Sequence, residues 1–78
     1  MMMVDDILAA LEKLDRQMVR LIADRRELVA QIPGGLSVDQ ELEIMSLWID
    51  EAVERELDEA SMEKMGKIVS QMCRKRGE

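Results

Sequence analysis

The chain has 78 residues, a formal net charge of −6, one cysteine and no histidine. A chain this short forms one small domain, residues 1–78, whose core usually needs disulfides, a metal or a partner subunit to be stable. An internal disulfide is impossible, and without histidine zinc sites and hydrolytic triads are disfavoured, so a partner subunit is the expected way to enlarge the core.

The first predicted element is one long helix over residues 4–32, which ends at the Pro33-Gly34-Gly35 break. Its apolar residues alternate in steps of three and four, which is the a/d seam of a heptad repeat. The seam positions are 4, 7, 11, 14, 18, 21, 25, 28 and 32, and Leu8, Ile22 and Val29 widen the stripe. At 1.5 Å per residue this helix is about 43 Å long. Because one small monomer cannot cover such a rod, we expect part of the stripe to meet a second copy.

Arg25 interrupts the apolar seam between Leu21 and Leu28. A guanidinium among packed side chains is costly unless an anion pairs with it. Two interpretations remain open. Arg25 forms a structural ion pair, for example with Glu41, or sets the register of a dimer. Alternatively, it belongs to an anion-binding pocket and holds a carboxylate through two parallel hydrogen bonds.

The second predicted helix covers residues 37–56. Ser37 and Gln40 have the spacing of a capping box at its start. Its apolar face contains Trp48, which is expected to be a core or interface anchor, together with Leu42, Met45, Ile49 and Ala52. Residues 37–63 hold ten acidic residues against one arginine, which disfavours nucleic acid as a partner.

The third predicted helix follows Asp58, which is a suitable N-cap. Cys73 is expected to be a small core residue, and the methionines are expected to fill gaps in a core nearly without aromatic residues. Basic residues near the end of this helix, Arg74, Lys75 and Arg76, suit its dipole. No segment alternates as a strand does, so the predicted fold is all-α, with one long and two short helices. No segment is long enough to span a membrane or to form a signal peptide, so we expect a cytoplasmic protein.

Residues 14–28, LDRQMVRLIADRREL, resemble the first helix of the all-helical class of chorismate mutase. In that family the helix has a leucine or isoleucine, an aspartate, apolar residues at helical spacing and then Ala-Glu-Arg-Arg-Glu-Leu or a close variant. The order of one long and two short helices is also similar. The resemblance implies an intertwined homodimer that exchanges its first helices and converts chorismate to prephenate in aromatic amino-acid biosynthesis.

The implied reaction is compatible with a chain that lacks histidine. Chorismate rearranges by a pericyclic shift, without proton transfer or a covalent intermediate. A catalyst holds the reactive conformer and stabilises negative charge on the ether oxygen, which requires cations and hydrogen-bond donors. No cofactor or metal is expected. Because chorismate is a dicarboxylate, at least two basic groups should bind it.

The family's functional residues are only partly present. The substrate-binding arginine of the first helix falls on Arg25, and the glutamate that contacts the substrate hydroxyl falls on Glu41, so these two are the candidate catalytic residues. The arginine before that glutamate falls on Gln40. The serine and glutamine of the third helix fall near Cys73 and Gly77, where the adjacent Arg76 is a candidate donor. The candidate substrate-binding residues are therefore Arg25, Gln40, Glu41 and Arg76.

Gln40 is a neutral donor where the family has a cation, and two further cations of the family are missing. The arginine that reaches into the partner's site falls on Leu8, and the lysine near the end of the first helix has no counterpart because the predicted helix stops at Pro33. Three hypotheses therefore remain: a shortened chorismate mutase, a non-catalytic descendant that serves as a regulatory or assembly dimer with a protein partner, and an unrelated helical dimer with a similar heptad pattern.

Overall fold

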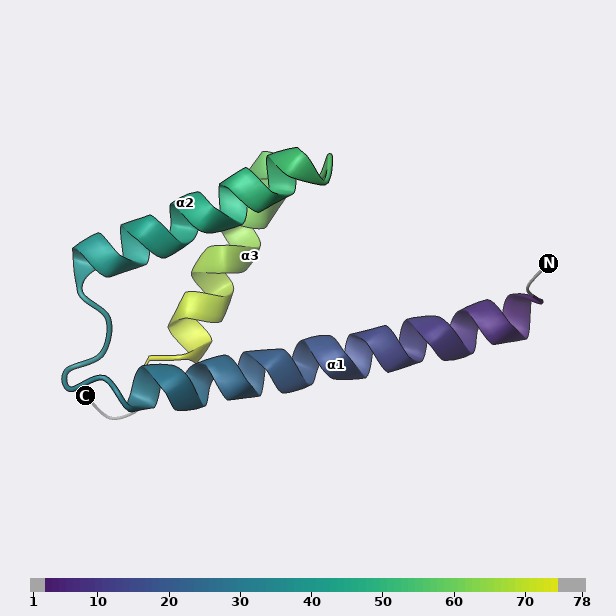
Figure 1. The fold of residues 1–78 in the computed structure, drawn as a ribbon, viewed down its shortest axis with the longest axis horizontal. Coiled ribbons are helices and arrows are strands. Elements are labelled where there is room, and N and C mark those ends of the chain that lie inside the picture. Colours follow the sequence, from purple (N-terminus) through teal and green to yellow (C-terminus); the bar gives the residue numbers. More distant parts are fainter. Residues whose placement is uncertain (1–2, 75–78) are drawn as a thin grey trace.

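The computed structural model describes residues 3–74, and within this range it contains three helices and no strand (Figure 1). They are α1 (Val4–Ala30), α2 (Val38–Glu54) and α3 (Glu59–Met72). The predicted all-α class, with one long and two shorter helices, is confirmed. No helix of the described range is long and apolar enough to cross a bilayer.

Both predicted helix starts are capped as expected. At α2 the Ser37 hydroxyl accepts the backbone N–H of Gln40 at 3.1 Å, and Gln40 Oε1 accepts the backbone N–H of Ser37 at 2.9 Å. At α3, Asp58 Oδ2 accepts the backbone N–H of Ser61 at 2.9 Å and the Ser61 hydroxyl at 2.6 Å. These bonds satisfy amide groups that have no partner inside the helix. The capping box and the Asp58 cap are therefore confirmed.

The first two helices end two residues earlier than predicted. After α1 the chain turns through Gly34 and Gly35, whose φ angles of 78° and 75° suit glycine. After α2 it turns at Glu56, a non-glycine residue with a φ of 58°. There the N–H of Leu57 bonds to the carbonyl of Ala52 at 2.8 Å, and the N–H of Glu56 to that of Val53 at 3.2 Å. This pair of bonds is a Schellman motif, which stops the helix at Glu54.

The small core lies between α2 and α3, which form a helical hairpin (Figure 1). Ala52, Gly66, Val69 and Cys73 are its buried residues, so Cys73 is a core residue, as predicted. Gly66 allows close packing, because a Cβ atom there would lie 3.0 Å from Met45 Sδ and 3.6 Å from Trp48 Cδ2. The two helices therefore approach closely where Gly66 faces Met45 and Trp48.

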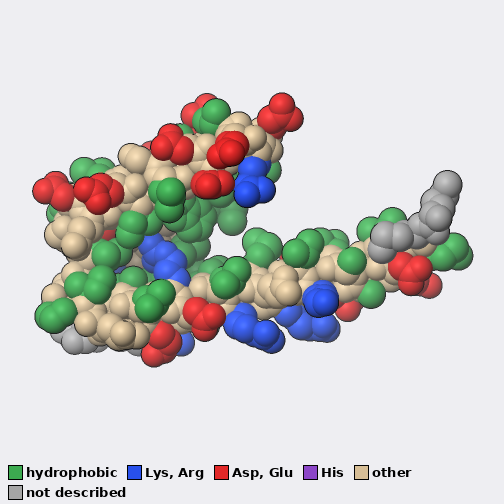
Figure 2. Space-filling view, viewed as in Figure 1, with side chains coloured by type: hydrophobic (Ala, Val, Ile, Leu, Met, Phe, Trp, Pro, Cys, Tyr) green, Lys and Arg blue, Asp and Glu red, His purple; other side chains and the backbone are tan. Residues whose placement is uncertain are grey.

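Helix α1 lies mostly outside this core and contains no buried residue. The half-buried residues Ile22, Ala23, Arg25 and Val29 lie in its C-terminal part, which runs below the hairpin, whereas the N-terminal part extends well beyond it (Figure 1). At 1.5 Å per residue the 27 residues of α1 span about 40 Å, against about 21 Å for the 14 residues of α3. The apolar side chains along the free part of α1 are therefore exposed (Figure 2).

Candidate functional site

Arg25 lies half-buried on the part of α1 that faces the hairpin. Its Nη1 atom is buried and has no hydrogen-bond partner within residues 3–74. The ion pair with Glu41 that the sequence suggested is not among the ion pairs of this range, in which Glu41 pairs with Arg74. A buried donor without an acceptor costs free energy, so Arg25 has an unmet need for an anion or another acceptor.

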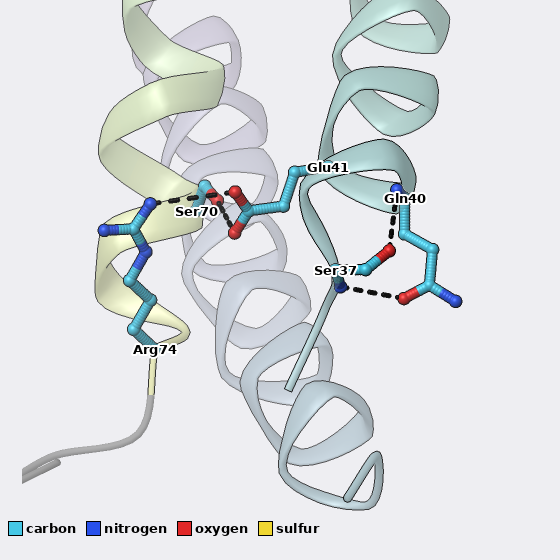
Figure 3. A network of polar contacts seen from close by, with 5 residues as sticks. All are labelled: Ser37, Gln40, Glu41, Ser70 and Arg74. Carbon is cyan, nitrogen blue, oxygen red and sulfur yellow. Dashed lines mark hydrogen bonds and ion pairs between the residues drawn. The ribbon is translucent and has the colours of Figure 1, made fainter. Parts of the chain in front are cut away.

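Glu41 connects the first turn of α2 to the end of α3 (Figure 3). Its Oε1 atom accepts the Ser70 hydroxyl at 3.4 Å, and its Oε2 atom lies 3.7 Å from Nη2 of Arg74. The Glu41 side chain is 30% exposed. A carboxylate at this position keeps an acceptor oxygen within reach of any ligand that enters between the helices.

A hollow of about 480 Å³ is lined by Arg25 and by residues of α2 and α3. Its volume lies within the usual range of small-molecule sites. Apolar side chains form part of its wall, namely Val38, Leu42, Ile44, Met45 and Trp48. A wider hollow of about 1180 Å³ shares Glu41, Ser70, Gln71 and Arg74 but lacks Arg25. We therefore take the smaller hollow as the candidate site, because it alone joins the unpaired arginine to Glu41.

The smaller hollow carries a positive charge in an acidic protein. Three cations line it, Arg25, Lys67 and Arg74, against two acids, Glu41 and Glu63, which leaves a formal charge of +1. Lys67 pairs with Glu63 at 3.3 Å. Since the lining residues include several cations and hydrogen-bond donors but no histidine or cysteine, the site suits the binding of a carboxylate better than proton transfer or nucleophilic attack.

The other predicted site residues lie elsewhere. Gln40 is exposed, uses its side chain in the capping box, points away from Glu41 and lines neither hollow (Figure 3). Leu8 lies on the free part of α1, far along the chain from Arg25. Arg76 and Gly77 lie outside the described residues. The structure thus brings together Arg25 and Glu41 and leaves Gln40 out.

The residues of α3 that line the hollow are not among the predicted site residues. The resemblance placed the family's serine near Cys73, whereas Ser70 supplies the hydroxyl beside Glu41. A signal was present, because Glu63, Lys67, Ser70 and Arg74 follow steps of four, three and four, which places them on one face of a helix. This polar stripe lines the smaller hollow.

No family model, no curated protein and no solved structure matches the chain.

Proposed function

We propose that the chain is a chorismate mutase-like protein that binds chorismate, or a closely similar dicarboxylate, in the smaller hollow and converts it to prephenate. The observation that supports this most is the buried Nη1 atom of Arg25, which has no partner in the described residues. A carboxylate of the ligand would supply the missing acceptor through a charge-assisted hydrogen bond. An intertwined homodimer is part of the same proposal.

Each lining group has a role that the pericyclic reaction can use. Arg25 would hold a carboxylate, and Glu41 would accept a hydrogen bond from the substrate hydroxyl. The apolar wall around Trp48 would pack against the ring and favour the folded conformer. The family's donor to the ether oxygen, a lysine near the end of the first helix, has no counterpart in α1. Because loss of one such donor typically lowers kcat by about 10²–10³-fold, we expect slow turnover.

The first experiment is the Arg25→Leu substitution. We expect it to abolish chorismate turnover, because the carboxylate loses its partner, and to keep or raise the melting temperature, because an unpaired partly buried cation is replaced by an apolar side chain. Turnover is measured by the loss of chorismate absorbance and stability by thermal unfolding. Arg16→Leu is the matched control, since Arg16 is an exposed arginine of the same helix, 3.7 Å from Glu12. This control should keep wild-type turnover.

Two results would contradict the proposal. One is a wild-type protein that leaves chorismate converting at the uncatalysed rate. The other is an Arg25→Leu variant that melts at a lower temperature but turns chorismate over normally, which would assign Arg25 to a structural ion pair across a dimer interface.

A second candidate function is a non-catalytic dimer with a regulatory or assembly role. It is favoured by the placement of Gln40, which is committed to capping α2, and by the apolar Leu8, both at positions where the family has cations. Calorimetry distinguishes the two. Binding of chorismate or of an effector without turnover supports the non-catalytic protein, whereas turnover above the uncatalysed rate excludes it.

A further inference from the structure

We propose that Arg74 is the second anion-binding group of the hollow, so that Arg25 and Arg74 each hold one carboxylate of the same small dicarboxylate. This inference rests on the proposed function only in that the hollow takes a dicarboxylate, and it does not require turnover. It differs from the expectation from sequence, in which Arg76 is the candidate donor near the end of the third helix.

Arg74 is well placed to exchange its partner. It follows the end of α3, lines the hollow together with Arg25, and has a side chain that is 63% exposed. Its Nη2 atom lies 3.7 Å from Glu41 Oε2, which is longer than the distance of about 2.7–2.9 Å typical of charge-assisted hydrogen bonds. An ion pair this exposed and this long contributes little to stability. A ligand carboxylate can therefore replace Glu41 at low cost.

The other cation of α3 is a poorer candidate. Lys67 also lines the hollow, but its Nζ is 3.3 Å from Glu63 Oε1 on the same helix. Lysine provides a point charge, whereas the planar guanidinium of arginine matches the two oxygens of a carboxylate. Arg74 is therefore the residue whose chemistry suits a second carboxylate.

Glu41 is expected to hold Arg74 in place in the free protein and to compete with the ligand. The Ser70 hydroxyl donates to the other oxygen of Glu41, so each carboxylate oxygen has a partner from α3 or the residues that follow it (Figure 3). A diacid without a hydroxyl group gains nothing from Glu41 and must displace it from Arg74. Glu41→Gln should therefore strengthen binding of such a diacid, whereas loss of Arg74 should weaken it.

The experiment uses Trp48 as the reporter, because it is the only tryptophan and lines the hollow. The probes are cis-cyclohexane-1,3-dicarboxylate and cyclohexanecarboxylate, which share a ring, differ by one carboxylate and do not absorb where tryptophan is excited. Tryptophan fluorescence titrations of the wild type should show a preference for the diacid. Arg74→Ala should weaken the diacid about tenfold, since a hydrogen bond to a charged group is lost. It should weaken the monoacid less, because the single carboxylate of the monoacid binds Arg25.

Controls separate Arg74 from general charge and folding effects. Arg55→Ala removes another exposed arginine, whose Nε atom lies 3.3 Å from Glu51 Oε2. Because Arg55 does not line the hollow, this variant should change neither titration. Arg74→Lys keeps the charge and should give a diacid affinity between those of the wild type and Arg74→Ala. It provides a second test if Arg74→Ala does not fold. Glu41→Gln should raise the diacid affinity.

The inference is overturned if the wild type shows no preference for the diacid, or if Arg74→Ala weakens both probes equally or neither. A preference that depends on Arg74 in a protein that does not convert chorismate would overturn the proposed catalysis and uphold this inference.

Discussion

Asp58 shows how one carboxylate sets the start of a helix and its response to pH. The hydrogen bond from the Ser61 hydroxyl, and then the one from the Ser61 backbone N–H, lower the pKa of Asp58 below its ordinary value of 3.8. Both bonds favour the ionised form. Because the pKa is lower in the folded than in the unfolded state, ionised Asp58 stabilises the fold at pH values above 3.8. This contribution is lost as the pH falls through the lowered pKa.

The Asp58→Asn variant tests this dependence. Asparagine also caps helices but does not titrate, so the difference in unfolding free energy between wild type and variant reports the charge alone. We expect the wild type to be more stable at neutral pH, and the difference to shrink below about pH 4 and to disappear once the pH is below the lowered pKa of Asp58. This difference in unfolding free energy is measured by urea unfolding at a series of pH values, with circular dichroism as the signal. Ser61→Ala, which removes the stronger of the two bonds, should flatten the pH dependence. A difference that is equal at pH 3 and pH 7 would contradict the assignment.

At the residue scale, local interactions could be predicted from sequence and tertiary ones could not. The Ser37–Gln40 and Asp58–Ser61 bonds join residues three apart, so spacing alone identifies them. The Glu41–Ser70 bond joins residues 29 apart. Periodicity located Arg25 in the apolar seam, but the lack of a partner for its Nη1 atom within residues 3–74 depends on how α2 and α3 lie against α1. Heptad spacing carries no information of that kind.

At the scale of the elements, two kinds of glycine have opposite requirements. Gly66 lies inside α3 where a Cβ atom would be 3.0 Å from the Met45 Sδ and Cε atoms. Gly34 has no atom within 4 Å of an added Cβ but has a φ of 78°. At Gly66 the space for a side chain is limiting, whereas at Gly34 the backbone conformation is limiting. The proline and two glycines predict the turn at Pro33-Gly34-Gly35 from sequence alone. The role of Gly66 becomes visible only in the packing of α2 on α3.

Gly66→Ala and Gly34→Ala should therefore change stability in opposite directions. Alanine favours a helix over glycine by up to about 1 kcal/mol, and the flexible end of Met45 can move aside, so Gly66→Ala should be neutral or stabilising by less than that amount. Gly34→Ala should destabilise by about 1–2 kcal/mol because alanine resists the left-handed conformation. Urea unfolding of both variants provides the comparison. A large loss of stability in Gly66→Ala would mean that Met45 and Trp48 are held rigidly.

At the scale of the whole molecule, α1 is longer than the structure it packs against. The heptad pattern predicted a rod that outgrows its subunit, and the described chain leaves the N-terminal seam uncovered, including Leu11 and Leu14 (Figure 2). Exposed apolar area of this kind usually marks an interaction surface. The partner and its orientation could not be predicted, because an a/d/e stripe is compatible with several helix pairings. A second copy of the chain is the occupant that the proposed function implies.

Leu14→Glu tests that whole-molecule proposal. Leu14 is 57% exposed in one chain and lies in the seam. Placing a carboxylate in a dimer interface there should cost about 2 kcal/mol or more per copy, since buried leucine is lost and a charge is desolvated. We expect native mass measurements to shift from dimer to monomer and the melting temperature to fall. Val19→Glu is the matched control, because Val19 is 68% exposed on the same helix but outside the seam, and its variant should remain a dimer. A wild type that is monomeric at all concentrations would contradict the dimer. A melting temperature that does not rise with protein concentration would also contradict it, because that of an obligate dimer must rise.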